Sequence, residues 1–275
     1  MLALVRAGRS RHHPAMLADL LAFLPSQLLI LLPLAFTAGL VDAAVGGGGL
    51  ILVPGLFAVL PREIPAALMG TNKFAAVMGT ASATWRYARQ VKLDWHLLLP
   101  SAVAAFCGAY LGARAIHLLP AQAVRPLVIV LLAAMLLYTW FKPAFGNQDA
   151  GRPLTRRDLY VGLAIGAAIG FYDGFFGPGT GSFLIFLFIR FFHFDFLRAS
   201  ASAKVVNLAT NLASLAFFIP AKMVIFGLAI PMALANIAGA QVGSRLALRG
   251  GNAWIRRLFL VLALVLLSKL IWDTF

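Results

Sequence analysis

A glycine-rich break occurs twice within long apolar sequence, and it constrains the fold more than any other feature. The first copy runs from Gly39 to Gly49 and ends in four consecutive glycines, and the second runs from Gly170 to Gly181. Glycine clusters interrupt helices because they add backbone entropy and permit positive φ. Inside a bilayer, irregular backbone is tolerated only where it is buried in protein or lines a wet cavity. Each break is therefore predicted to form part of a binding site between two shorter helices.

The rest of the chain has the composition of a membrane protein. Of its 275 residues, 61% are hydrophobic and only 12% are charged. Apolar stretches of about 20 residues, the length that crosses a bilayer as a helix, recur along the whole chain. Polar and apolar residues alternate too weakly along these stretches for a transmembrane β-barrel. The predicted fold class is all-α, a polytopic helical membrane protein.

The net charge of +14 does not indicate nucleic-acid binding. Basic residues stand singly or in small groups at the ends of apolar segments, as is typical of cytoplasmic loops and of contacts with anionic lipids. We therefore expect the lipid bilayer, and no nucleic acid, among the partners. The basic leader, residues 1–19, precedes a long apolar run without a small-residue cleavage site, which indicates an uncleaved first membrane segment.

The two halves of the chain match without a gap at an offset of 131 residues. This offset pairs Asp42 with Asp173 and Lys73 with Lys204, and it also pairs several glycines and arginines. Because charged and glycine matches in one register are rare by chance, an internal duplication is the simplest explanation. The predicted organisation within one membrane domain is a leader at 1–19, a first repeat at 20–141, a central loop at 142–158 and a second repeat at 159–275.

Each repeat is predicted to contain a re-entrant helix pair at its break and about three transmembrane helices. The expected arms of the second break, 159–171 and 182–192, measure only about 16–20 Å as helix, against about 30 Å of hydrocarbon. Re-entrant pairs leave three crossings in each half, so the second half is inverted, with both termini outside and the central loop in the cytoplasm. If the first arm crosses completely, the repeats are parallel instead; we adopt the inverted arrangement.

Several motifs recur in both halves: the G-x-x-D-x-x-x-G-x-G breaks, the Asn72-Lys73 and Ala203-Lys204 segments, and the G-A-x-[LV]-G-[AS]-R runs at 108–114 and 239–245. Together they resemble the sulfite exporter TauE/SafE family, over nearly the whole chain from about Leu28. The resemblance implies a multi-pass transporter in the bacterial inner membrane, moving sulfur-containing oxyanions such as sulfite or organosulfonates. Substrates vary within that family, so the resemblance supports transport better than it supports sulfite.

Two lysines are the leading candidates for binding the anion. Lys73 and Lys204 lie well inside apolar segments, where an ammonium is costly unless it is paired or hydrated. Lys204, Asn207 and Asn211 form one polar stripe at helical spacing, and Asn72 directly precedes Lys73. The structural alternative is that each lysine forms an ion pair with an intramembrane carboxylate, or reaches to an interface.

Asp42 and Asp173 stand just before the breaks and are assigned a coupling or structural role. They could cap the break or neutralise the lysines, which are the simpler roles. A third possibility is that they carry a coupling proton.

The breaks themselves offer backbone N–H groups. At the start of a half-helix these groups have no intrahelical partner and carry partial positive charge, so an oxyanion can bind them directly. The residues expected to act in this way are Gly48, Gly49, Gly179, Thr180, Gly181 and Ser182. The structural alternative is close helix packing, but four consecutive glycines exceed what packing requires. Packing is instead the interpretation of the G-x-x-x-G spacings that begin at Gly108 and Gly239.

The predicted function is a secondary carrier that moves a small oxyanion by alternating access around the two breaks. The alternatives are a passive anion channel with the same fold, or a carrier of another small organic anion. A scaffold without transport would have no reason to carry two intramembrane lysines. Neither metal-ligand spacing nor a hydrolytic triad occurs, so we expect no cofactor, no metal and no enzymatic activity. The sequence leaves open the transport direction, the coupling ion and whether the chain forms a homo-oligomer.

Overall fold

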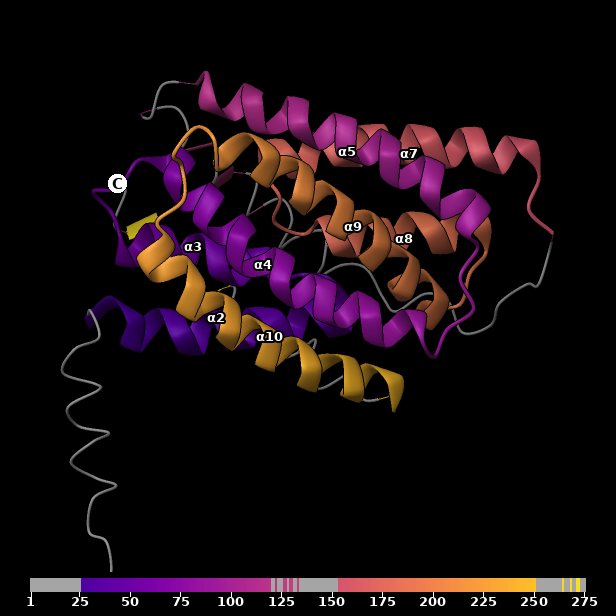
Figure 1. Cartoon of the computed structure of the whole chain (residues 1–275), viewed down its shortest axis with the longest axis horizontal. Helices are drawn as coiled ribbons and strands as arrows, with labels where there is room; N and C mark the ends of the chain where they lie inside the picture. Colours follow the sequence, from indigo (N-terminus) through magenta and orange to yellow (C-terminus); the bar gives the residue numbers. More distant parts are fainter. Residues whose placement is uncertain are drawn as a thin grey trace, which may run out of the picture.

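The computed structural model describes residues 26–119 and 153–250, together with single positions between 122 and 133 and between 264 and 272. These residues form a helical bundle (Figure 1), and the described part of the chain contains no strand. The helices are α2 (Ser26–Val45), α3 (Gly49–Val59), α4 (Pro65–Ala88), α5 (Trp95–His117), α7 (Arg156–Phe175), α8 (Thr180–Phe192), α9 (Phe196–Phe218) and α10 (Phe226–Leu248). The prediction of an all-α fold is confirmed.

Two predicted transmembrane segments, 123–141 and 254–272, lie mostly outside the described residues. The positions that are described within them are helical. The leader at 1–19 and most of the central loop at 142–158 also lie outside the described part of the chain.

The arms of the breaks differ from the prediction in one respect. The first arm of the second break was expected to be short, but α7 begins inside the expected loop and contains 20 residues, which makes it about 30 Å long. Its counterpart α2 also contains 20 residues. Only the second arms are short, with 11 residues in α3 and 13 in α8. The prediction that both arms are short is therefore wrong for the first arm.

Local sequence explains the length of α7. Thr155 and Asp158 form a reciprocal capping box that starts the helix early. Gly170 and Gly174 do not interrupt the helix, because they are packing positions: a Cβ atom on either would lie 2.3 or 1.9 Å from a backbone oxygen of α5. The helix ends only near Gly177, whose φ of +93° a side chain would strain.

Helices α5 and α7 pack side by side and run in the same direction, as do α2 and α10. Successive glycines of α7, at 162, 166, 170 and 174, lie against successive α5 positions 97, 101, 105 and 109. In the other pair, a Cβ atom on Gly239 would lie 1.8 Å from the carbonyl oxygen of Phe36, and one on Gly243 would lie 2.0 Å from that of Leu40. The packing role predicted for the G-x-x-x-G spacings is confirmed.

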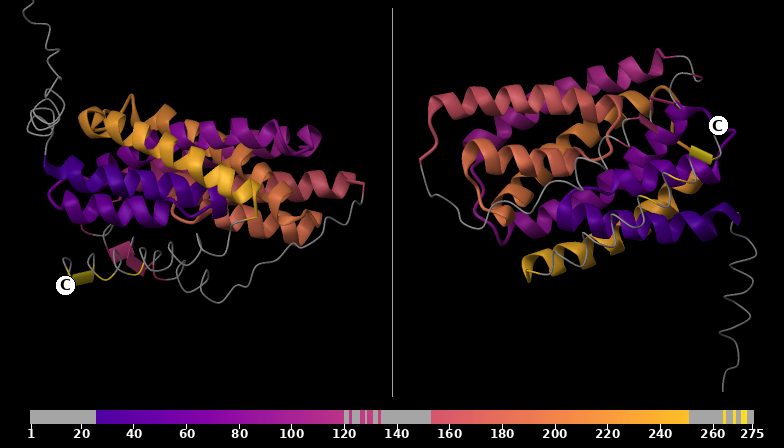
Figure 2. Two further views of the ribbon diagram at one scale, coloured as in Figure 1. Left: turned by 90° about the horizontal axis from the view of Figure 1, so that it is seen from below. Right: turned by 180° about the vertical axis from the view of Figure 1, so that it is seen from behind.

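These contacts, together with the short connections, fix the direction of every described helix. α2, α4 and α10 begin at one end of the bundle, on the left of Figure 1, and α3, α5 and α9 end there. α5, α7 and α9 begin at the opposite end, and α4, α8 and α10 end there. Each break thus joins a long helix to a short helix that returns to the same end. The two further views in Figure 2 show the helices lying lengthwise along one another.

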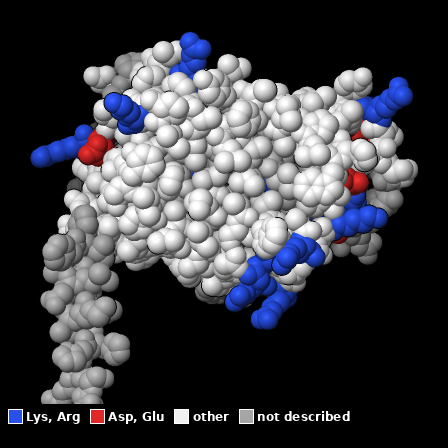
Figure 3. Space-filling view, viewed as in Figure 1, with Lys and Arg blue, Asp and Glu red and all other residues white. Residues whose placement is uncertain are grey.

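The outer surface suits a bilayer. Among the described residues, α2, α5 and α10 are long and apolar enough to cross a membrane. Figure 3 shows Lys and Arg side chains around the ends of the helices, with a broad uncharged surface between them. Large apolar side chains are exposed on this surface, for example Leu99, Val103 and Leu111 of α5 and Leu234 of α10. An apolar belt with charged ends is the pattern of a membrane-embedded protein.

Candidate anion-binding site

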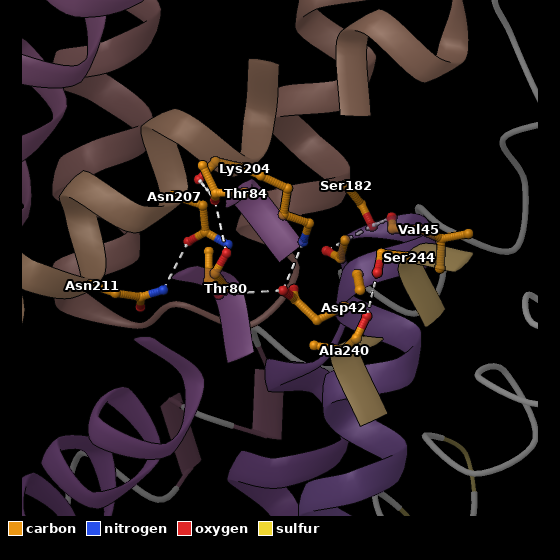
Figure 4. A network of polar contacts seen from close by, with 12 residues as sticks. Asp42, Val45, Thr80, Thr84, Ser182, Lys204, Asn207, Asn211, Ala240 and Ser244 are labelled. Atoms are coloured by element: carbon orange, nitrogen blue, oxygen red, sulfur yellow. Dashed lines mark hydrogen bonds and ion pairs between the residues drawn. The ribbon is translucent and has the colours of Figure 1, made fainter. Parts of the chain in front are cut away.

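The two breaks touch one another inside the bundle. The backbone N–H of Ser182 donates to the carbonyl oxygen of Gly46 at 2.7 Å, and its hydroxyl donates to the carbonyl oxygens of Val45 at 2.9 Å and Gly46 at 3.1 Å (Figure 4). A Cβ atom on Gly46 would lie 2.4 Å from the carbonyl carbon of Gly181, so the backbones are in close contact. Gly46 and its counterpart Gly177 both have positive φ, +82° and +93°. Glycine is required at both positions because another residue would be strained there.

Two ion pairs inside the bundle connect the halves of the chain beside these breaks. Lys73 Nζ lies 2.6 Å from Asp173 Oδ2, and Lys204 Nζ lies 2.7 Å from Asp42 Oδ2. Each lysine thus pairs with the aspartate of the other half. The ion pair foreseen as the structural alternative for both lysines is therefore formed, and both aspartates neutralise a lysine. Such pairs tolerate burial because each charge compensates its partner.

The four charged side chains are not equally accessible. The side chain of Asp42 is 19% exposed, whereas that of its partner Lys204 is 1% exposed. Lys73 and Asp173 are both nearly inaccessible. Asp42 also accepts a long hydrogen bond, 3.5 Å, from the hydroxyl of Thr80 on α4, as Figure 4 shows.

A small cavity lies between the breaks and the ion pairs. Its volume is about 30 Å³, enough for about two water molecules. The residues predicted from the sequence that line it are Gly48, Gly49, Gly179, Thr180, Gly181, Asn72, Lys73, Asn207, Asn211, Asp42 and Asp173. Residues from both halves, far apart in the chain, thus surround one space.

Two predicted residues, Lys204 and Ser182, do not belong to the cavity wall. Lys204 lies behind Asp42, and its ammonium is directed to that carboxylate (Figure 4). Ser182 lies beside the cavity, but its N–H and hydroxyl are both bonded to carbonyl oxygens of the first break. Both residues therefore support wall residues instead of facing the cavity.

Asn236 of α10 was not among the residues predicted from the sequence. Its side chain is buried and lines the cavity, and Nδ2 donates to the carbonyl oxygen of Ala35 on α2 at 2.9 Å. The signal that could have found it is an amide in the middle of an otherwise apolar segment, 226–248. Gly46 and Gly177 also line the cavity, although the sequence analysis assigned them only to the motif.

Hydrogen-bonding groups without a described partner, several N–H donors and one amide oxygen acceptor, lie at this cavity. The short helices α3 and α8 begin here, and the backbone N–H groups of Gly48, Gly49, Gly179 and Gly181 have no acceptor among the described residues. Asn72, which is 4% exposed, has a buried Oδ1 without a hydrogen-bond partner in the described part of the chain. Free N–H groups at two helix starts give the cavity the chemistry of an anion site.

The sequence profile of the family described as Sulfite exporter TauE/SafE matches residues 31–270. The chain belongs to this family. It is 36% identical over 247 residues to a probable membrane transporter protein, ORF9, from a Sinorhizobium species, covering 90% of this chain and 93% of the relative. It is 33% identical over 254 residues to the probable membrane transporter protein YfcA of Escherichia coli, covering 92% and 93%.

A third relative, a probable membrane transporter protein of Haemophilus influenzae, is 32% identical over 250 residues, covering 90% of this chain and 95% of its own. No solved structure matches the chain. The resemblance found in the motifs is confirmed, and TauE/SafE membership identifies a membrane transporter. The names of these relatives specify no substrate.

Proposed function

We propose that this TauE/SafE protein is a secondary carrier of a small sulfur-containing oxyanion such as sulfite, which binds in the cavity between the two breaks. The observation that carries the proposal is the convergence of two half-helix starts, with unpartnered N–H groups, on one buried cavity. Partial positive charge at helix starts stabilises an oxyanion without requiring a free cationic side chain. No enzymatic step is part of the proposal.

Side chains of the wall add to these backbone donors. Lys73 and the amides of Asn207 and Asn211 also line the cavity, and each can donate a hydrogen bond. Together with the backbone they offer donors on several sides, as a tetrahedral or pyramidal oxyanion requires.

The directions of the helices support an inverted repeat. At the offset of 131 residues α2 corresponds to α7, α3 to α8, α4 to α9 and α5 to α10, and each corresponding pair runs in opposite directions. The helix pair α2 and α3 at the first break starts and finishes at one end of the bundle, and the pair α7 and α8 at the second break starts and finishes at the opposite end. Alternating access then follows from movement of the halves around a fixed site near the membrane midplane.

The charge distribution supports one orientation in the bacterial inner membrane. Basic residues gather at the end where α5, α7 and α9 begin: Arg86, Arg89, Lys92, Arg156, Arg157, Arg190, Arg198, Arg245 and Arg249. The described residues at the opposite end include only Arg62, Arg114 and Lys222. By the positive-inside rule the first end is cytoplasmic. The central loop then lies in the cytoplasm, and both chain ends lie outside.

The cavity favours a carrier over the alternative of a passive channel. It holds about 30 Å³ and is bordered by two ion pairs that join the halves of the chain. A channel requires a continuous wet path with weak, multiple sites. Counterflow in proteoliposomes separates the two: a carrier loaded with unlabelled sulfite accelerates uptake of labelled sulfite, whereas a channel shows no such stimulation. A panel of small carboxylates in the same assay tests the alternative of another organic anion.

Binding to the purified protein tests the proposal itself. We expect sulfite to bind saturably at one site and to raise the unfolding temperature, because a ligand that binds only the folded state stabilises it. Absence of binding for sulfite, thiosulfate and sulfonates alike would contradict the proposal.

A further inference from the structure

The net charge of the side chains around the cavity is zero. Lys73 is neutralised by Asp173 at 2.6 Å, and Lys204 by Asp42 at 2.7 Å. Lys73, Asp42 and Asp173 line the cavity and Lys204 lies behind Asp42; no further Lys, Arg, Asp or Glu among the described residues lines it. Any anion that enters must therefore be balanced by something other than a free side-chain charge.

The remaining positive charge comes from the two helix starts. α3 begins at Gly49 and α8 at Thr180, both in the cavity wall. A helix N-terminus acts as roughly half an elementary positive charge, so the two together supply about one. This balances a singly charged anion, whereas a doubly charged anion would leave about one negative charge uncompensated. In a largely buried site such a charge is strongly unfavourable.

Asn72 adds a second, independent constraint. Its Oδ1 is buried, has no hydrogen-bond partner among the described residues, and belongs to a side chain in the cavity wall. A buried acceptor without a donor is costly, so a ligand that donates a proton to it is favoured. An oxyanion without hydrogen cannot supply that donor, but one that keeps an O–H group can.

We infer that the substrate is a small, singly charged oxyanion that retains an O–H donor, as hydrogen sulfite does, and that Asn72 accepts this proton. The inference rests on the proposed function, because it concerns the same cavity. It excludes the doubly charged form of sulfite as the species that binds. The volume of about 30 Å³ likewise favours a compact anion over larger organosulfonates.

Calorimetric titration of the unmodified protein with sulfite across a series of pH values tests the charge. Hydrogen sulfite loses its proton near neutral pH, whereas methanesulfonate stays singly charged throughout and serves as the control ligand. Above the pKa of hydrogen sulfite, we expect the apparent affinity for total sulfite to fall about tenfold per pH unit, with methanesulfonate binding unchanged. Sulfite affinity that is constant or rises with pH would overturn the inference. A parallel decline for methanesulfonate would assign the effect to the protein and would also overturn it.

A variant tests the role of Asn72. At low pH the unmodified protein should bind hydrogen sulfite about tenfold more tightly than methanesulfonate, because only the former donates to Asn72. Asn72→Leu should remove this preference, because it should lower the affinity for hydrogen sulfite about tenfold more than the affinity for methanesulfonate. Ser202→Ala is the matched control, since Ser202 Oγ is also buried without a described partner but lies outside the cavity wall; it should change neither affinity.

Each outcome separates this inference from the proposed function. If Asn72→Leu keeps the preference, Asn72 does not accept the proton and that assignment is wrong. Should Asn72→Leu fail to fold, the pH series on the unmodified protein still decides the charge of the ligand. If neither sulfite nor methanesulfonate binds at any pH, the proposed function itself fails, and the inference fails with it.

Discussion

Lys73 and Asp173 stand 100 positions apart in the chain, yet Nζ of the lysine lies 2.6 Å from Oδ2 of the aspartate. This bond joins α4 of the first half to α7 of the second. Its counterpart, between Lys204 and Asp42, joins α9 to α2 at 2.7 Å. Two halves whose sequences match at an offset of 131 residues are therefore joined by crossed ion pairs beside a shared cavity, so we expect changes to these pairs to affect both stability and binding.

The first prediction concerns stability. Lys73→Met should lower the free energy of unfolding by about 3–5 kcal/mol, because it leaves the carboxylate of Asp173 buried and unpaired. The double variant Lys73→Met with Asp173→Asn should recover most of that loss. Denaturant unfolding in detergent measures both. Equal stabilities for the single and double variants would show that the pair is not coupled in the folded protein.

The second prediction compares the two ion pairs in binding. Lys73 lines the cavity, whereas Lys204 does not. The neutral double variant Lys73→Met/Asp173→Asn should therefore weaken sulfite binding by about tenfold or more, through loss of a charged donor. Lys204→Met/Asp42→Asn removes a charged pair of the same kind and is the control, with a smaller expected effect. A larger loss in the control would mean that Lys204, not Lys73, reaches the anion.

The third prediction concerns orientation. Reporter tags or accessible cysteines placed in the central loop, 142–158, should be accessible from the cytoplasm, and those at both chain ends from the periplasm. The physical reason is the concentration of basic residues where α5, α7 and α9 begin. Chain ends that react from the cytoplasm would contradict the proposed inverted arrangement.

The fourth prediction separates packing glycines from site glycines. Gly239→Val places a side chain where a Cβ atom alone would lie 1.8 Å from the carbonyl oxygen of Phe36, so α10 must move away from α2. Thermal unfolding should occur at a lower temperature, while the fraction that remains folded should bind sulfite with unchanged affinity. Normal stability in Gly239→Val would show that this contact does not hold the two helices together.

Much of the fold could be predicted because its signals are local or periodic. Apolar segments, turn residues and G-x-x-x-G spacings located the helices and the contacts of Gly239 and Gly243. The length of α7 was not predicted, because Gly170 and Gly174 look like helix breakers in sequence. In the folded protein they allow close approach to α5 instead, and only Gly177 ends the helix through positive φ.

Less of the site than of the fold could be predicted from the sequence. The stripe containing Lys204, Asn207 and Asn211 indicated a polar helix face, but not that Lys204 would be directed to Asp42. The pairing of each lysine with the aspartate of the other half depends on how the two halves pack in space. Residue spacing along the chain does not predict that packing. Asn236 has no polar residue three or four positions away on its helix and was missed for that reason, although its side chain lines the cavity.

If the second break binds the anion through its backbone, a side chain at Gly179 should abolish binding. Gly179 caps the start of α8 with φ of +83°, so Gly179→Val strains the break by about 1–3 kcal/mol and displaces the nearby N–H groups. Isothermal titration of the folded variant with sulfite at low pH is the measurement, with Gly239→Val as the control, because Gly239 lies outside the cavity wall. We expect sulfite binding to be lost in Gly179→Val and retained in Gly239→Val. Full affinity in Gly179→Val would show that the anion binds elsewhere and that the break serves only as a hinge or packing element.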